Sequence, residues 1–246
     1  MSNATEAADR LVAARGSGRP VAWQDVLPSD RTAAYAIQDA TLARIGPIGG
    51  WKVGASNAEA EPNCAPLPAS CLLASGARLG TGLLRGVEAE VALRVGRVLT
   101  ADDAALPDQE LAKAFDAAYP VIEVVETRLA DWTNSAALAK LADLQSHGAL
   151  VIGPAATTSI ASIDLRRIEA HIAIGDDISK RTTGGNPAGD IWRMLRWLIR
   201  HCAERGVPLS PGQIVTTGSC TGMIFAKEGA SVRARLEGLG EVAVDF

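Results

Sequence analysis

The sequence predicts an α+β fold built around a mixed β-sheet. Strand-like segments recur from residue 51 to the end of the chain, and some alternate in polarity while others are apolar throughout. Helical segments do not separate them in the repeated order of a parallel α/β fold, and the chain ends in a predicted hairpin, residues 232–236 and 241–244. We expect a helical segment, residues 1–50, followed by a domain that spans residues 51–246.

The composition excludes several classes of function. The 246 residues carry a net charge of −4 without any basic run, so nucleic acid is not an expected partner. No apolar stretch approaches the roughly 20 residues of a membrane span, and the first residues lack signal-peptide features. The four cysteines show no C-x-x-C spacing, so we expect reduced thiols and no zinc site. These observations favour a cytoplasmic protein that binds or converts a small molecule.

The N-terminal half contains predicted helices, strands and a long loop. Helices are expected over residues 4–14 and, after Asp30, over residues 31–45. Residues 57–77 contain two Cys and three Pro with little periodicity, and we expect a long loop that acts as a lid or a binding loop. The expected strands in this half are residues 51–54 and 86–95.

The C-terminal half alternates helices with strands. A helix is expected after Pro107, and its apolar positions Leu111, Ala114, Phe115 and Ala118 should point inward. Asn186 is expected to cap the last helix, with Pro187 at its first position. The other expected elements are strands at residues 121–126, 149–153, 168–174 and 213–217, and a short helix at residues 136–143.

The strand at residues 86–95 carries a Glu-x-Glu pair. Glu88 and Glu90 share one face of this strand, with their Cα atoms about 6.5 Å apart. Two carboxylates so placed repel each other unless a cation lies between them. A solvated outer face of an antiparallel strand produces the same pattern, so the pair alone does not establish a metal site.

A third carboxylate lies in the middle of a strand that is apolar on both faces. Glu123 shares a face with Val121 and Val125. A buried carboxylate is costly unless it is paired or bound to a metal, so Glu123 is either a third metal ligand or the partner of a buried arginine. Glu126, at the strand end near Arg128, is expected to form a surface ion pair.

Further candidate residues lie outside these strands. Lys52 stands between two apolar residues, so its stem is either held in the core or is that of an ordinary lysine with an exposed amine. Asp143, Gln145 and His147 gather where a helix ends and a buried strand begins, a common position for active-site groups. His147 is either a general acid or base or a hydrogen-bonded loop histidine.

A G-x-C-x-G motif, residues 218–222, follows a predicted strand. This form is typical of a cysteine nucleophile elbow in an α/β-hydrolase. That fold places its histidine after the nucleophile, whereas the last histidine here, His201, precedes Cys220. The order excludes the elbow, and we interpret the glycines and hydroxyls, including those of Thr217 and Ser219, as donors arranged for an anionic group.

Several ordered motifs occur at compatible spacing from about residue 30 onward. They are residues 34–38 (AYAIQ), 50–54 (GWKVG), 87–90 (VEAE), 120–128 (PVIEVVETR), 141–143 (LAD) with Ser146 and Gly148, and 212–219 (GQIVTTGS). Together they resemble the fumarylacetoacetate hydrolase superfamily, in its branch of 2-keto-4-pentenoate hydratases and oxalocrotonate decarboxylases.

This resemblance implies a β-roll-like core with flanking helices, a small N-terminal helical part and a homo-oligomer. Three carboxylates without His or Cys ligands favour Mg²⁺ or Mn²⁺. The implied site consists of a divalent metal on Glu88, Glu90 and Glu123, a catalytic lysine at Lys52, an acid or base at Asp143, and carboxylate-binding donors around Ser219.

The activity implied is that of a metal-dependent hydratase, which adds water to a 2-hydroxy-alka-2,4-dienoate to give a 4-hydroxy-2-oxo acid. The acid would chelate the cation, which would stabilise an enolate. Lys52, its pKa lowered by the metal and by burial, would move one proton, and Asp143 another with assistance from His147. The alternatives are a 2-oxo-3-enedioate decarboxylase, an acylpyruvate-type C–C hydrolase and a non-catalytic protein that binds 2-oxo acids.

Two absences bear on the substrate. C–C hydrolases of the superfamily place a Glu-His pair on the lid, and no histidine precedes His147 here, which counts against hydrolysis. A second acidic group in the substrate would need a cation on the lid, and residues 57–77 contain Glu59 and Glu61 but no Lys or Arg. The sequence therefore favours a substrate with one carboxylate.

Overall fold

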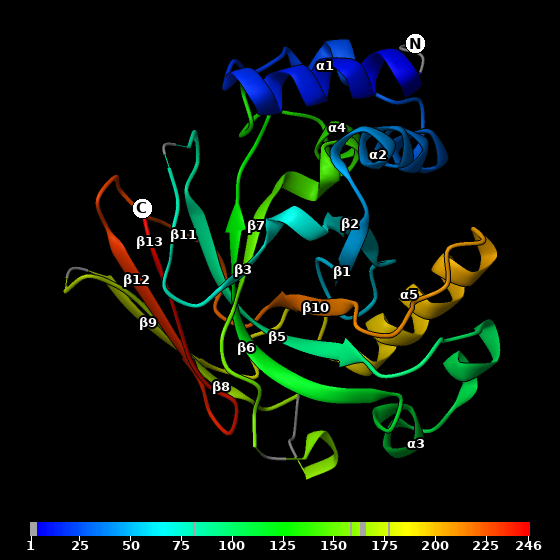
Figure 1. Ribbon diagram of the computed structural model, residues 1–246, viewed down its shortest axis with the longest axis vertical. Coiled ribbons are helices and arrows are strands. Elements are labelled where there is room, and N and C mark those ends of the chain that lie inside the picture. The colour runs from blue at the N-terminus through cyan, green and yellow to red at the C-terminus, as the bar shows by residue number, and fades with distance from the viewer. Residues whose placement is uncertain (1–3, 81, 158, 163–165, 177) are drawn as a thin grey trace.

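The fold consists of a large curled β-sheet, a smaller sheet beside it, and helices packed around the large sheet (Figure 1). A computed structural model describes residues 4–80, 82–157, 159–162, 166–176 and 178–246. No helix within these ranges is long and apolar enough to cross a lipid bilayer.

The large sheet is mixed, as the sequence predicts. In order across the sheet, its strands are β2 (Asn63–Pro68), β1 (Ile48–Gly54), β10 (Ile214–Ser219), β5 (Gly86–Val95), β6 (Phe115–Val125), β7 (His147–Ile152) and β3 (Leu72–Ala74), and β11 (Ile224–Phe225) pairs with β5. The pairs β1–β10 and β3–β7 are parallel, and the other pairs are antiparallel. The predicted α+β class is confirmed.

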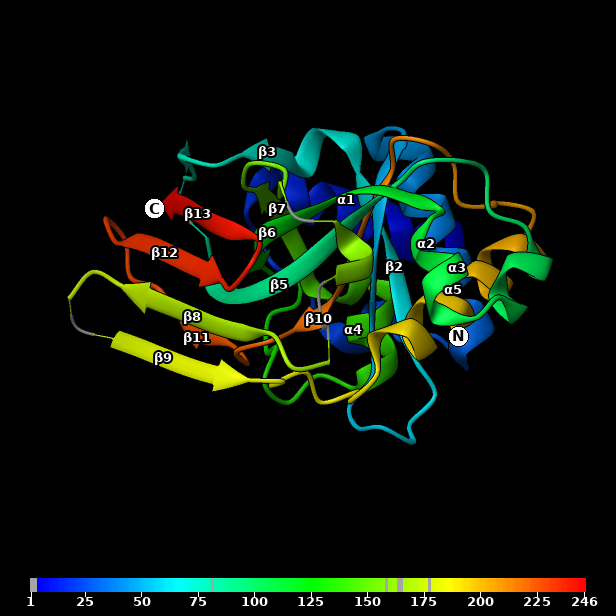
Figure 2. The ribbon, with the colours of Figure 1, turned by 90° about the horizontal axis from the view of Figure 1, so that it is seen from below.

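The smaller sheet packs against the middle strands of the large one. Its order is β4 (Ala77–Arg78), β13 (Gly240–Asp245), β12 (Ser231–Leu236), β8 (Glu169–Ile174) and β9 (Ile178–Thr183). The predicted terminal hairpin is confirmed as β12 and β13. β9 was not predicted, because its six residues are mostly exposed and show no apolar alternation, and it lies at the outer edge of the sheet (Figure 2).

The helices are α1 (Ala4–Ser17), α2 (Arg31–Ile45), α3 (Asp108–Ala112), α4 (Ala137–Ala142) and α5 (Ile191–Glu204). The start of α2 agrees with the prediction, since the Asp30 carboxylate accepts a hydrogen bond from Ala33 N at 2.8 Å. Helices α1, α2 and α4 lie together at one end of the molecule, and α5 lies apart from them (Figure 1). Short 3₁₀ segments are Trp23–Val26, Ala69–Cys71, Ala101–Ala105, Leu144–Ser146 and Ile160–Ser162.

The two faces of the large sheet differ in character. One face of β5 belongs to the main core. Its side chains are each at most 1% exposed, and they are those of Val87, Ala89, Val91 and Leu93. The residues between them point to the other face, where Ala92 belongs to a smaller apolar cluster. Alternation therefore places the Glu-x-Glu pair opposite the main core, as expected from the period of two.

The expectation of a long loop at residues 57–77 is wrong. Outside strands and 3₁₀ segments lie only the first part, up to residue 62, and the two-residue turn 75–76, because β2, the segment Ala69–Cys71, β3 and β4 take up the rest. Pro66 and Pro68 favoured a loop, but β2 is an edge strand that, among the described residues, pairs only with β1. Proline is tolerated at an edge, since one side of the strand needs no hydrogen-bond donor.

Two predicted helix boundaries are also wrong. Helix α3 ends at Ala112, and Phe115 begins β6, where it pairs with Val95. The predicted inward positions are buried, but the last two, Phe115 and Ala118, belong to a strand. Helix α5 begins after Asp190, whose carboxylate accepts from Trp192 N, and not after Asn186.

Candidate metal centre and active site

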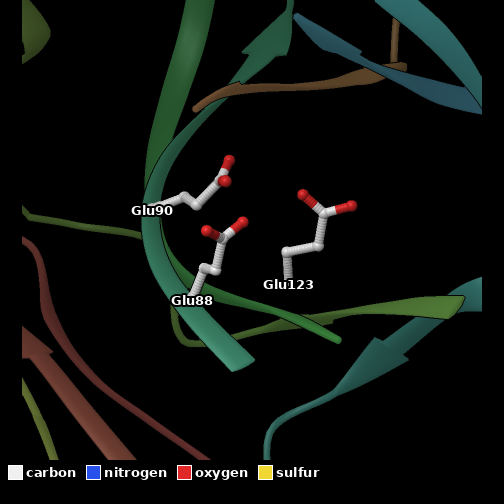
Figure 3. Close-up of side chains that lie close together, drawn as sticks. All are labelled: Glu88, Glu90 and Glu123. Atoms are coloured by element: carbon white, nitrogen blue, oxygen red, sulfur yellow. The ribbon is translucent and has the colours of Figure 1, made fainter. Parts of the chain in front are cut away.

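The register of β5 and β6 brings the three glutamates together. Glu88 lies directly opposite Glu123 in the antiparallel ladder, and Glu90 lies two residues further along β5. One carboxylate oxygen from each residue lies within 4.8 Å of the other two, and the three side chains point toward one another (Figure 3). Glu90 and Glu123 are each 1% exposed, so this face is not the solvated outer face that the sequence left open.

The three carboxylates are electrostatically unfavourable together without a cation. Burial and the charge of Glu123 raise the pKa of Glu88 to about 7. The same causes, with the charge of Glu88 added, raise the pKa of Glu90 well above its ordinary value. A close set of oxygen ligands without nitrogen or sulfur fits a hard divalent cation. The residues present therefore fit a metal of this class.

Hydrogen bonds from β10 hold Glu90 in place. Its Oε2 accepts from Gly218 N at 3.0 Å and from the Thr216 hydroxyl. Thr216 is itself paired in register with Lys52 of β1, so the neighbouring strand orients one ligand and positions the lysine. Thr216 was not identified from the sequence, although the alternation along β10 places it on the face of Glu90.

Lys52 lies directly against the glutamates. Its Nζ is 2.5 Å from Glu123 Oε1 and donates to Gln145 O at 3.2 Å. Burial lowers the pKa of Lys52, but the charges of Glu123, Glu90 and Glu88 outweigh burial and raise it. The protein groups alone therefore do not produce the lowered pKa expected from the sequence, and they favour a protonated amine.

His147 is the first residue of β7 and not a loop residue. It is fully buried, and its Nδ1 lies 3.2 Å from Glu123 Oε1. Burial lowers its pKa to about 4 against the opposing effect of Glu123, so the ring is neutral at pH 7. Because a carboxylate oxygen accepts, Nδ1 carries the proton, and Nε2 is left as a buried acceptor without a partner among the described residues.

A strained turn precedes this histidine. Leu144, Gln145 and Ser146 have φ of 47°, 54° and 58°, which non-glycine residues adopt at a cost of about 1–3 kcal/mol each. The turn is held by Glu126 N, which donates to Ser146 O at 2.8 Å, and by Trp132 Nε1, which donates to Ser146 Oγ at 2.9 Å. It presents the Gln145 carbonyl to the lysine and leaves Gln145 Oε1 buried and unpartnered within the described residues.

Asp143 is bound to Arg128 at the base of this turn. Arg128 Nε donates to Asp143 Oδ1 at 2.5 Å, Arg128 N donates to Oδ2 at 3.0 Å, and both side chains are at most 5% exposed. Arg128 also donates to the Asp143 and His147 carbonyls. Among the described residues, the Asp143 carboxylate accepts hydrogen bonds from Thr127 and Arg128 and forms none with Lys52 or Glu123.

The predicted surface ion pair of Glu126 with Arg128 is therefore wrong. Arg128 is committed to Asp143, and Glu126 instead accepts from the backbone N–H groups of Leu84 and Thr127. These hydrogen bonds link the loop before β5 to the end of β6. The reason is burial, because Arg128 is 5% exposed and needs a buried carboxylate as its partner.

An Asp143→Ala substitution is expected to lower the free energy of unfolding by about 3–5 kcal/mol, because it leaves the Arg128 guanidinium buried without its carboxylate. Urea unfolding followed by circular dichroism measures this loss. Asp116→Ala is the matched control, since Asp116 pairs with Arg94 where both side chains are more than 40% exposed, and it should cost less than about 1 kcal/mol. Equal losses in the two variants would contradict the structural role of Asp143.

The hydroxyls of Thr217 and Ser219, at the end of β10, have different surroundings. Thr217 Oγ1 is buried and donates to Val91 O at 3.0 Å, so its proton is already used. Ser219 is paired in register with Glu90, and its Oγ is buried without a well-aligned partner among the described residues, although it is close enough to Glu88 to lower the pKa of that carboxyl. Burial raises the pKa of the Cys220 thiol to about 12, which is unsuited to a nucleophile.

Residues 52–246 match the family model of the fumarylacetoacetate (FAA) hydrolase C-terminal domain. The chain belongs to the fumarylacetoacetate hydrolase family. Among curated relatives, 2-keto-4-pentenoate hydratase 2 and 2-keto-4-pentenoate hydratase 1 of Dechloromonas aromatica (strain RCB) are each 33% identical to it. The alignments cover 98% and 100% of this chain and 96% and 100% of those proteins.

A solved structure has the same fold. The structure of 4-oxalocrotonate decarboxylase from Pseudomonas putida G7, complexed with magnesium and adipate, superposes with a TM-score of 0.84 at 20% identity. The superposition covers 99% of this chain and 97% of that one. The family model begins at residue 52, whereas the alignments with the hydratases cover nearly the whole chain, so their similarity extends into the segment before residue 52.

Proposed function

We propose that this protein is a divalent-metal-dependent hydratase that adds water to a 2-hydroxy-alka-2,4-dienoate and yields a 4-hydroxy-2-oxo acid. The observation that carries the proposal is the buried group of Glu88, Glu90 and Glu123 with Lys52 and His147 both bonded to Glu123. Relatives at 33% identity over nearly their whole length are named as 2-keto-4-pentenoate hydratases, which supports the same reaction.

Mg²⁺ or Mn²⁺ would be held by Glu88, Glu90 and Glu123. When bound, such a cation would act as a Lewis acid and would stabilise negative charge that develops on the 2-oxygen of the substrate. The magnesium named in the decarboxylase structure supports a cation of this class.

Hydration of the dienol needs a proton delivered to C5 and another to C3, and it releases one proton from the 2-hydroxyl and one from the attacking water. Lys52 has a raised pKa and three donor hydrogens, so it is the proton donor. His147 is neutral with an unpartnered Nε2, so it accepts the proton of the water. Both side chains bond to Glu123 Oε1, which fixes their positions relative to each other.

The remaining candidate residues orient these groups or the substrate. Asp143 is a positioning residue, since with Arg128 it holds the turn before His147. Gln145 and Ser219 each offer a buried polar atom without a well-aligned partner, and they bind polar atoms of the substrate. Thr217 has a structural role, because its hydroxyl donates to Val91 O. Ser219 is therefore the residue of β10 that donates to the substrate.

The test is the loss of the ultraviolet absorbance of 2-hydroxypenta-2,4-dienoate. With Mg²⁺ we expect loss of absorbance and formation of 4-hydroxy-2-oxopentanoate, and we expect no reaction after EDTA treatment or with Glu88→Ala. Glu126→Gln is the matched control, because Glu126 lies outside the group of three and its contacts are to backbone N–H groups. No turnover by the metal-loaded wild type, or full activity in EDTA, would refute the proposal.

One alternative reaction has its own support. The TM-score of 0.84 with 4-oxalocrotonate decarboxylase is consistent with decarboxylation of a 2-oxo-3-enedioate, which also passes through charge on the 2-oxygen. Release of CO₂ from such a diacid, without hydration of the dienoate, would replace the hydratase assignment while leaving the metal centre in place.

A further inference from the structure

A cavity lies on the reverse side of the large sheet from the metal centre. It has a volume of about 420 Å³, and its wall includes Val124 of β6 and Ala149 of β7, which are paired in register. Val124 follows Glu123 along β6, so the two side chains lie on opposite faces of the sheet. The sheet therefore separates this cavity from the three carboxylates.

The rest of the wall comes from the end of α1, the loop before β5 and the last residue. Its apolar side chains include Pro20, Leu79, Leu83 and Phe246, and its polar groups include three arginines. Small-molecule sites typically have volumes of roughly 300–1,000 Å³ and combine apolar side chains with a few polar groups. The size and the lining of this cavity agree with a site of that kind.

Two of the arginines lie side by side at one end of the cavity. Arg15 Nη2 and Arg128 Nη1 both donate to His147 O, at 3.3 Å and 2.8 Å. Arg128 is paired with Asp143, whereas Arg15 forms no ion pair within the described part of the chain. The other contact of Arg15 is with Cys71 Sγ at 4.0 Å. Arg15 therefore has no carboxylate partner.

The Arg15 guanidinium is electrostatically unfavourable in this position. Burial and the charge of Arg128 lower its pKa, against the opposing effects of Cys71 and Asp143. It is still protonated at pH 7, because an arginine is not deprotonated in proteins. A partly buried charge without a partner is costly. A carboxylate in the cavity would remove this cost, since its two oxygens match the planar fork of a guanidinium.

The other charged side chains of the wall already have backbone partners. The Arg85 guanidinium donates to two backbone carbonyls, and the Glu126 carboxylate accepts from the backbone N–H groups of Leu84 and Thr127. Among the side chains known to line the cavity, the arginines outnumber the single carboxylate of Glu126. The wall thus favours an anion over a cation.

We propose that this cavity is a second binding site, separate from the metal centre, which takes a monocarboxylate with an apolar body and pairs its carboxylate with Arg15. One carboxylate suffices, because Arg128 is already used by Asp143. The apolar wall requires a body larger than that of a small hydrated anion. The inference does not depend on the proposed function, since Glu88, Glu90 and Glu123 do not line the cavity.

The test compares 4-phenylbutanoate with 4-phenylbutanamide, which lacks the charge, and with acetate, which lacks the apolar body. Binding is measured by titration calorimetry on EDTA-treated protein, because the metal-free glutamates repel an anion from the metal centre. The carboxylate should bind the wild type at least about tenfold more tightly than the amide, and acetate should show no measurable binding. In Mg²⁺, saturating oxalate, which chelates the cation, should leave the affinity for 4-phenylbutanoate within about twofold.

Arg15→Met should weaken binding of 4-phenylbutanoate by about tenfold and leave the amide within about twofold. Arg15→Lys should keep the carboxylate the tighter of the two probes. Arg19→Met is the matched control, because it removes the same charge from an exposed residue outside the wall, and it should leave both affinities unchanged.

Equal affinities of the wild type for 4-phenylbutanoate and its amide would overturn the proposal, and this comparison does not require a variant to fold. An unchanged preference for the carboxylate in Arg15→Met would also overturn it. Displacement of 4-phenylbutanoate by oxalate would place the probe at the metal centre and refute a second site, while the proposed function would stand.

Discussion

Replacing Glu90 by Gln is expected to raise the melting temperature of the protein in EDTA by about 2–4 °C, which corresponds to about 1 kcal/mol for a chain of this size. Glu90 is 1% exposed, and its carboxylate lies within 4.8 Å of two others, so removal of its charge relieves repulsion. The amide oxygen of Gln can still accept from Gly218 N and the Thr216 hydroxyl, which preserves packing.

The same substitution should abolish the response to metal. A wild-type protein in Mg²⁺ at about 100 times its dissociation constant should melt about 5–10 °C higher than in EDTA, and Glu90→Gln should show no such rise. Hydratase activity should fall by at least about 10³-fold. Differential scanning fluorimetry with and without Mg²⁺ measures the first effect, and Glu126→Gln should behave as the wild type does. A Glu90→Gln protein that is still stabilised by Mg²⁺ would remove Glu90 from the metal site.

Replacing Lys52 by Met is expected to lower kcat by about 10²–10⁴-fold, the usual contribution of a positioned proton-transfer group. Its amine lies 2.5 Å from Glu123 Oε1 and is 12% exposed, so neither water nor another described side chain replaces it readily. The loss of this cation leaves the three carboxylates less compensated. We therefore expect a lower melting temperature in EDTA and an equal or larger rise on addition of Mg²⁺, the opposite of the Glu90→Gln result.

The Lys52 prediction is checked by steady-state kinetics together with thermal melts. Lys113→Met is the control, because Lys113 is an exposed residue paired with Glu110 on the surface, and it should change neither measurement. A Lys52→Met enzyme that keeps kcat within tenfold of the wild type would show that the lysine only balances charge. The melt in EDTA separates that outcome from a misfolded variant.

Local sequence patterns were sufficient to predict on which face of a strand most site residues lie. The period of two between Val87 and Leu93 put Glu88 and Glu90 on one side of β5, and the apolar run around Glu123 placed that residue inside. Both patterns depend only on the strand repeat and on the cost of burying a charge. The same reasoning found the terminal hairpin and the start of helix α2 after Asp30.

Where local signals compete, the sequence prediction failed. The prolines of β2 are typical of a loop, but an edge strand leaves one side of its backbone unpaired and accepts them. Leu144, Gln145 and Ser146 carry no signal for a left-handed turn, because non-glycine residues avoid it unless surrounding contacts enforce it. Here those contacts come from Glu126, Trp132 and the Arg128–Asp143 pair.

Which site residues of different strands come together depended on pairing between segments that lie far apart in the chain. The order β1-β10-β5-β6-β7 brings Lys52 to Glu123, and the β5–β6 register sets Glu88 opposite Glu123. The strand period determines the face on which a side chain lies. The side chains that it meets across strands depend on hydrogen-bond register and topology, which involve residues far apart in the chain and leave no local pattern.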